Sequence, residues 1–147
     1  MNNKKEKKAG LHKRISNKDE VVNEMIEIYQ PLGRDWMGYK MTNSNPYTYH
    51  HITEKRNGGG VTVDNGALLT KTAHSDLNLL DLYCPEAYEE YQALFRYINE
   101  SKSPITEELY EYIEELALDI FTGNGFQFSK TPIPFSKERE KKMLKKI

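Results

Sequence analysis

The stretch YTYHHITEKRNGGGVTVDNGALLTKTAHSDLNLLDL, residues 47–82, decides the fold that we expect for this chain. Residues 47–53 are rich in aromatic and β-branched side chains, which predicts a strand. A turn signal, Asp-Asn-Gly at 64–66, precedes a second short strand over 67–70. A helical pattern then runs to about Leu82. The sequence therefore predicts a small hairpin that leads directly into a helix.

Helical patterns lie on both sides of this stretch. Apolar residues recur at helical spacing over about 17–30, 85–100 and 107–121, and the last two make up a helical C-terminal part, 85–121. An isolated two-stranded hairpin is marginally stable at best, so other elements must complete its core. We therefore expect an α+β fold, mostly α, in which a short two-stranded antiparallel hairpin and its helix are surrounded by additional helices.

Single residues mark the expected helix starts and a loop anchor. Thr70 or Thr72 can cap the helix that follows the hairpin, and Thr106 can cap the last helix. Pro85 suits the first turn of the helix between them. Trp36 is expected to anchor the loop that precedes the hairpin.

Composition limits the class of protein. A chain of 147 residues with a mean hydropathy of −0.78 is expected to form one domain with a modest core. We find no apolar stretch long enough to span a membrane and no apolar segment of the secretory type after the basic N-terminus. The single cysteine, Cys84, excludes an intramolecular disulfide and a cysteine-rich zinc site. We therefore expect a cytoplasmic location and no membrane partner.

The net charge of −1 hides an uneven distribution. Residues 1–14 carry +5 within a basic N-terminal tail at 1–16, and a basic C-terminal tail at 137–147 carries +4. The residues between the two charged segments therefore carry −10. The basic tails could contact DNA as arms, or they could be solvated chain ends. The pI of 6.4 is not typical of a strongly DNA-avid protein.

Histidines concentrate in the stretch that decides the fold. Neighbouring residues on a strand point to opposite faces, so His50 and His51 are expected to have different roles. His74 and Asn78 share one face of the predicted helix, from which an imidazole and an amide can converge on one cation. A hairpin packed on this helix would bring His50, His74 and Asn78 together, and His51 would then face a substrate. Asn65 can bond to the backbone or to a neighbouring imidazole.

This stretch resembles the HNH endonucleases, the ββα-metal nucleases, over about residues 47–82. The resemblance rests on a histidine pair on the first strand, an asparagine in the connection, and a helix histidine with a further ligand position four residues later. The steps from 51 to 65, 65 to 74 and 74 to 78 are 14, 9 and 4 residues, and they are similar to those of the family. His-His-Ile, a Gly-Gly loop and Asn-x-x-Leu-Leu are also typical of the family core.

The resemblance implies a role for each of these residues. His51 matches the general base that removes a proton from the attacking water, and Asn65 matches the asparagine that holds this base and its loop in place. His50 and His74 match metal ligands, and Asn78 matches the last ligand position. The implied cofactor is one divalent metal ion (Mg, Mn, Zn or Ni), and the implied products are 5′-phosphate and 3′-hydroxyl ends. A histidine base suits this chemistry near neutral pH.

Two positions depart from the family pattern. Three basic side chains also lie next to the motif residues. Many members carry cysteine pairs for a structural zinc, one cysteine standing just before the helix histidine, where this chain has Ala73. Asn78 stands where histidine is frequent. Lys55 and Arg56 after the first strand, and Lys71 before the helix, could each meet a DNA phosphate or be solvated loop charges.

The function that we expect is a metal-dependent HNH endonuclease that hydrolyses phosphodiester bonds of its partner, DNA. One alternative is a catalytically degenerate HNH scaffold that binds DNA or acts as a regulator, which need not retain a cation. The other is a helical protein–protein adaptor, suggested by the tyrosine-rich helix at 85–100 and the acidic helix at 107–121. The adaptor hypothesis expects His50, His74 and Asn78 to lie far apart.

Overall fold

The computed structural model describes residues 17–129 and confirms a mostly helical α+β fold. Its main elements are α2 (Asn17–Tyr29), β1 (Tyr47–His51), β2 (Gly66–Thr70), α3 (Lys71–Tyr83), α4 (Pro85–Ser101) and α5 (Glu107–Asn124). Two single-turn 3₁₀ helices lie between the strands, η1 (Lys55–Asn57) and η2 (Val63–Asn65). The predicted basic tails lie outside the described residues. Within residues 17–129, no helix is both long and apolar enough to cross a membrane.

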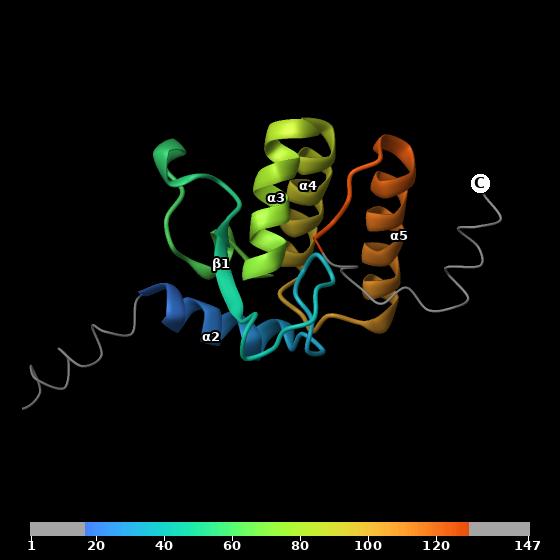
Figure 1. Ribbon diagram of the computed structural model, residues 1–147. Helices are drawn as coiled ribbons and strands as arrows, with labels where there is room; N and C mark the ends of the chain where they lie inside the picture. Colours follow the sequence, from blue (N-terminus) through green and yellow to red (C-terminus); the bar gives the residue numbers. More distant parts are fainter. Residues whose placement is uncertain (1–16, 130–147) are drawn as a thin grey trace, which may run out of the picture.

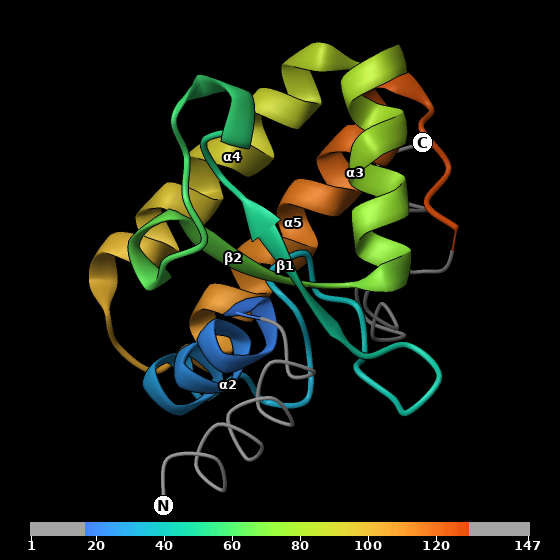
Figure 2. The ribbon, with the colours of Figure 1, turned by 90° about the vertical axis from the view of Figure 1, so that its left-hand side faces the viewer.

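The two strands form the predicted antiparallel hairpin, and β2 runs into α3 without a loop. Tyr47 pairs with Thr70 at one end of the ladder and His51 pairs with Gly66 at the other. Figure 2 shows the paired strands, with α2 near the hairpin and α3 continuing from β2. α2 contacts β1, while α3 contacts both strands and packs along α4. Figure 1 shows α3 and α4 side by side. The hairpin is therefore held between α2 and the α3–α4 pair.

One hydrophobic cluster joins residues from both strands and from α2, α3, α4 and α5. Trp36 is fully buried, so its predicted role as an anchor of the preceding loop is confirmed. Its ring packs edge-on against Tyr29 of α2, with the ring centroids 4.9 Å apart, and it also lies beside Phe95 of α4. Burial of such large aromatic rings stabilises the core and fixes this loop against it.

The fully buried carboxylate of Asp35 ties the same loop to the hairpin. One of its oxygens accepts hydrogen bonds from the backbone N–H groups of Met37 and Tyr39, each over 2.9 Å. The other accepts from the N–H and the hydroxyl of Thr70, over 2.8 and 2.7 Å. A buried carboxylate is tolerated where its oxygens are hydrogen-bonded in this way.

The start of α3 is fixed by side chains from two places in the chain. Of the two predicted caps, Thr70 is the one used, because its hydroxyl accepts a hydrogen bond from the N–H of Ala73. The side chain of Thr72 instead donates to the Asn45 side-chain oxygen, which also accepts from the Thr72 N–H. The predicted cap at Thr106 is confirmed for α5.

The first strand is two residues shorter than predicted, ending at His51 rather than at residue 53. The reason lies in the loop that follows it. The side chain of Asn65 occupies both the N–H and the C=O of Thr53, over 2.7 and 2.9 Å, so this residue cannot continue the ladder. Asn65 therefore ends the strand by competing for its backbone groups.

The loop between the strands requires glycine at position 59. A Cβ atom there would lie 1.8 Å from the backbone oxygen of Thr53 and 2.7 Å from the Asn65 side chain, whereas a Cβ at Gly60 would meet only Thr62, at 4.0 Å. We expect Gly59→Ala to lower the free energy of unfolding by about 1–3 kcal/mol, as overpacking does. Urea unfolding of Gly59→Ala and of the matched Gly60→Ala checks this. Equal effects of the two substitutions would contradict it.

Candidate functional site

The hairpin and α3 bring two of the predicted metal ligands together. His50 on β1 is buried, with 7% of its surface exposed, and half-buried His74 lies in the first turn of α3. Their ring centroids are 5.4 Å apart and the ring planes are nearly perpendicular, at 87°. Phe95 of α4 packs on His50 with the centroids 5.5 Å apart. Two imidazoles from distant sequence positions therefore lie side by side in a largely apolar setting.

One nitrogen of each ring has a side-chain partner. Nε2 of His50 lies 2.7 Å from the side-chain oxygen of Gln92, which is buried on α4. Nδ1 of His74 lies 3.2 Å from the hydroxyl of Thr48 on β1. Both partners also donate hydrogen bonds to carbonyl oxygens of the hairpin region. The two rings are therefore oriented by polar groups that are themselves fixed.

Burial keeps the three histidines of the site neutral. It lowers the pKa of His50 to about 4, against the raising effect of the hydrogen bond with Gln92. Burial also lowers the pKa of His51 and of His74, and the positive charge of Lys18 on α2 adds to the lowering at both. A neutral imidazole is the form that can accept a proton or bind a cation, and the lowered pKa values favour this form in all three rings near neutral pH.

His51 lies on the other face of β1, as the alternation of the strand predicts. Its ring meets Tyr49 edge-on, with the centroids 4.8 Å apart. Tyr49 is fixed in turn, since its hydroxyl lies 2.8 Å from the carbonyl oxygen of Thr62. Nε2 of His51 is buried and has no hydrogen-bond partner in the part of the chain that the structure describes. Lys18 and Lys55 both lower the pKa of this ring, so positive charge lies near it.

Asn65 holds the loop after β1 rather than the imidazole of His51. Its side-chain oxygen accepts from the N–H of Thr53, and its NH₂ group donates to the carbonyl oxygens of Thr53 and Gly60, over 2.9 and 3.0 Å. Its backbone oxygen accepts from the N–H of Ile52, next to His51. The contacts of Asn65 thus fix the backbone directly after the candidate base.

The other predicted site residues lie at the surface. Asn78 is exposed on α3, one turn after His74. Lys55 and Arg56 are exposed on η1, where Arg56 pairs with Glu54 over 2.5 Å, and Lys71 is exposed at the start of α3. An exposed ion pair of this kind contributes little to stability, so Arg56 can leave it for another anion at small cost. Contact of these cations with DNA stays a prediction.

The described residues supply two nitrogen donors of a metal site, which is less than a complete ligand set. Residues 17–129 contain no group of three or more His, Cys, Asp or Glu side chains that could hold a metal ion. Two imidazoles that share a zinc ion at about 2.1 Å would have centroids about 5.3 Å apart at a tetrahedral angle. The observed 5.4 Å between His50 and His74 agrees with this spacing. These two rings therefore fit as a pair of nitrogen donors, with Asn78 or water left to complete the ligand set.

Sequence reasoning missed three residues of this site. Gln92, Thr48 and Lys18 surround the histidines, but none belongs to the motif that drew attention to residues 47–82 as a site. A signal for Gln92 was present, because it is a polar residue on the apolar face of its helix, between Tyr88 and Phe95. Thr48 and Lys18 carry no such signal, since a threonine on a strand and an exposed lysine are both ordinary.

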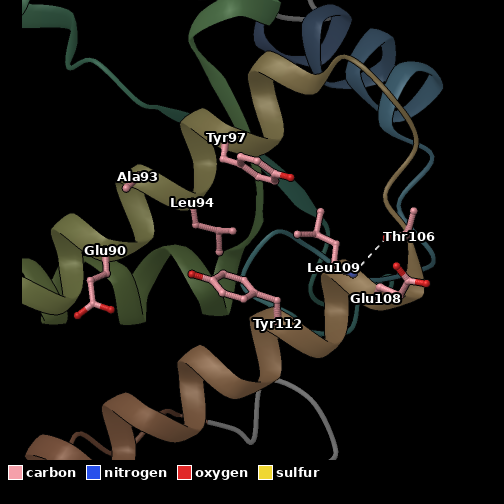
Figure 3. A pocket seen from close by; sticks show the side chains of 8 residues that line it. All are labelled: Glu90, Ala93, Leu94, Tyr97, Thr106, Glu108, Leu109 and Tyr112. Atoms are coloured by element: carbon pink, nitrogen blue, oxygen red, sulfur yellow. Dashed lines mark hydrogen bonds between the residues drawn. The ribbon is translucent and has the colours of Figure 1, made fainter.

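A pocket elsewhere in the molecule contributes nothing to this site. It lies between α4 and α5, as Figure 3 shows, and its lining includes the side chains of two tyrosines and two glutamates. The lining residues are Glu90, Ala93, Leu94, Tyr97, Thr106, Glu108, Leu109 and Tyr112. His50, His51 and His74 do not border this pocket, so it adds no residue to the candidate site.

Lowered histidine pKa values predict a loss of stability in acid. Since the pKa of His50 is about 4 in the folded chain, the unfolded chain binds the proton first, at about pH 6.5. In metal-free protein with chelator, we expect His50 to add about 3 kcal/mol of stability above pH 6.5, lost progressively as the pH falls to about 4. Urea unfolding across this range checks it against His50→Asn.

The comparison with His50→Asn is needed because another group opposes this trend. Burial raises the pKa of Asp35 to about 6, so this carboxyl favours folding as the pH falls through the same range. The difference between wild type and variant isolates the contribution of His50. The prediction is wrong if both proteins lose stability with the same pH slope.

Comparison with known proteins does not place this site in a family. No family model, curated protein or solved structure matches the chain.

Proposed function

We propose that this protein is a metal-dependent endonuclease of the HNH type, which hydrolyses DNA phosphodiester bonds with a histidine general base and one divalent cation. The observation that carries the proposal is that His50 and His51 have different surroundings on the two faces of β1. On one face, His50 lies against His74. On the other, His51 has a buried Nε2 without a partner in the described residues. These two observations support the proposal, because the resemblance over residues 47–82 implies a ligand role for His50 and His74 and a base role for His51.

In the proposed reaction, His51 takes a proton from water as the water oxygen attacks phosphorus. A new P–O bond forms, the bond to the leaving oxygen breaks, and that oxygen takes up a proton from solvent to leave 5′-phosphate and 3′-hydroxyl ends. The lowered pKa of His51 keeps its imidazole neutral near pH 7, as a base must be. Edge-on contact with Tyr49 limits the positions that the ring can take.

His50 and His74 would hold the cation, and Asn78 would add the last protein ligand. When bound, a divalent cation neutralises charge on the phosphoryl group and stabilises the leaving oxygen. Asn65 keeps the backbone after His51 in place through its bonds to Thr53 and to the Gly60 carbonyl. The base therefore has a fixed position relative to the ligands on the other face of the strand.

Cations around the site are suited to DNA. Lys18 and Lys55 lie close enough to His51 to lower its pKa, and exposed Arg56 and Lys71 lie on η1 and at the start of α3. Phosphate contacts of this kind position a backbone without reading its sequence. A cytoplasmic location, expected from the sequence, forms part of the proposal.

The contact between His50 and His74 is also what separates the alternatives. A helical adaptor with accidental histidines expects these rings to be far apart, whereas their centroids are 5.4 Å apart. A degenerate scaffold that binds DNA without cutting it has the same geometry, so only an activity measurement separates it from the nuclease.

A plasmid-cleavage assay on purified full-length protein tests the proposal. We expect conversion of supercoiled DNA to nicked or linear forms in the presence of Mg²⁺, Mn²⁺, Zn²⁺ or Ni²⁺, and no conversion in EDTA. Cleavage that persists in EDTA would contradict the role of the cation. DNA binding without cleavage in any of the four metals would favour the degenerate scaffold, and absence of both would favour the adaptor.

A further inference from the structure

We propose that Gln92 on α4 is a positioning residue that fixes which nitrogen of His50 is protonated, and that Thr48 does the same for His74, so that each ring offers a lone pair to one divalent cation. The inference rests on the proposed function for the identity of the ligand. It extends the site to α4, outside the 47–82 segment that resembles the family.

The proton on His50 follows from the bonds of Gln92. The NH₂ group of Gln92 donates to the carbonyl oxygen of Ile52 over 2.7 Å, and a carbonyl oxygen can only accept. The side-chain oxygen of Gln92 therefore faces His50, 2.7 Å from Nε2. Because this oxygen is also only an acceptor, Nε2 of His50 must carry the proton. The lone pair of the neutral ring is then on Nδ1.

The same reasoning places the proton on His74. The hydroxyl of Thr48 donates its hydrogen to the carbonyl oxygen of Leu69 over 2.7 Å. The oxygen of Thr48 is then free only to accept, and Nδ1 of His74 lies 3.2 Å from it. Nδ1 of His74 therefore carries the proton, and the lone pair of this ring is on Nε2.

The two assignments leave one unprotonated nitrogen on each of two adjacent rings. Within residues 17–129, neither Nδ1 of His50 nor Nε2 of His74 has a hydrogen bond. Histidines that bind a metal usually donate the N–H of their other nitrogen to a fixed acceptor, which sets the tautomer and the ring orientation. Gln92 and Thr48 supply such acceptors before any cation is present.

Gln92 is well suited to this role because its side-chain amide cannot rotate to exchange its oxygen and NH₂ group. Only 4% of it is exposed, and both ends of its amide are engaged. Rotation of the amide would set its NH₂ against an N–H donor and its oxygen against the carbonyl oxygen of Ile52. Two buried groups would lose their partners at once, at a large cost in free energy.

Nuclear magnetic resonance on metal-free protein tests the assignments directly. Long-range ¹H–¹⁵N correlation spectra of ¹⁵N-histidine protein at pH 7.5 separate the two tautomers of each neutral ring. We expect Nε2–H on His50 and Nδ1–H on His74, assigned by the loss of each signal in His50→Asn and His74→Asn. The opposite tautomer on either ring would overturn the proposal for that ring.

Metal binding tests the consequence. We expect Gln92→Met to weaken Zn²⁺ binding by about 10–100-fold, measured by isothermal titration calorimetry, as loss of such an outer partner does. Gln92→Glu keeps an acceptor for the N–H of His50, so we expect its affinity to fall less than that of Gln92→Met.

Asn99→Leu is the matched control. Asn99 is a second buried amide on α4, and it donates to the carbonyl oxygens of Val63 and Gly66 without touching a histidine. Its loss disturbs packing similarly but should leave Zn²⁺ affinity within about threefold of wild type. Equal weakening in Asn99→Leu and Gln92→Met would overturn the positioning role, and so would wild-type affinity in Gln92→Met.

These outcomes are distinct from those of the cleavage assay. Expected tautomers and Gln92-dependent Zn²⁺ binding in a chain that cuts no DNA would support this proposal and contradict the nuclease. Cleavage by the wild-type protein together with unchanged Zn²⁺ affinity in Gln92→Met would support the nuclease and contradict the role of Gln92. If wild-type protein binds no Zn²⁺ in the titration, the role of Gln92 in cation binding is refuted.

Discussion

Replacement of His51 by alanine is expected to abolish DNA cleavage while leaving the fold intact. A positioned general base contributes about 10²–10⁴-fold to a rate, so we expect cleavage to fall at least about 100-fold. The loss should be confined to activity, because His51 is half-buried and its Nε2 makes no hydrogen bond in the described residues. Plasmid cleavage with the metal that gives the highest wild-type activity checks the loss of activity, and the thermal unfolding midpoint checks that the fold is intact.

Two controls make this result specific. Ser75→Ala changes an exposed residue of α3 beside His74 and should retain wild-type cleavage. Added imidazole should restore part of the activity of His51→Ala, because a free base can enter the space left by the ring. Wild-type cleavage by His51→Ala would show that this histidine is not the base. Loss of cleavage with a collapsed unfolding midpoint would show a structural role instead.

Local patterns predicted the elements of this fold well, because the residues that form them carry strong signals. The side chains of Thr70 and Thr106 cap helices where predicted, and Trp36 anchors its loop. The end of β1 was predicted two residues too late, because the competitor for its backbone is the side chain of Asn65, twelve residues further along the chain. Side-chain bonds of that range leave no periodic trace in a sequence.

The candidate site was predictable to the same extent. Strand alternation and helical spacing predict that His50, His74 and Asn78 come together and that His51 lies apart. The structure shows His50 against His74 and His51 against Tyr49, whereas Asn78 is exposed. Their polar partners were not predictable, because Gln92 comes from α4 and meets His50 only after the tertiary packing of helix on hairpin. Periodicity identifies which face a residue occupies, but it does not say which residue of another element it will meet.

The hydrogen bonds of Asp35 were not predictable from the sequence for the same reason, and its replacement should strongly destabilise the fold. We expect Asp35→Ala to lower the free energy of unfolding by about 5 kcal/mol or to unfold the chain, measured by urea unfolding at pH 7.5. Truncation would leave four buried donors without their acceptor, on Met37, Tyr39 and Thr70, and each such loss costs about 1–3 kcal/mol. Asp81→Ala, on the exposed side of α3, should change stability by no more than about 0.5 kcal/mol.

The effect of Asp35 should extend to the histidines, because one chain of bonds leads from it to α3. The Thr70 hydroxyl donates to Asp35 and accepts from the N–H of Ala73, so the carboxylate orients the cap of the helix that carries His74. Asp35→Asn is similar in size, but both carboxylate oxygens of Asp35 accept from N–H or O–H groups. The NH₂ group of asparagine would therefore face donors on one side, and those donors would lose their acceptor. In any folded fraction of this variant we expect weaker Zn²⁺ binding than in wild type. A variant as stable as wild type, with the same Zn²⁺ affinity, would show that Asp35 fixes neither the loop nor the helix.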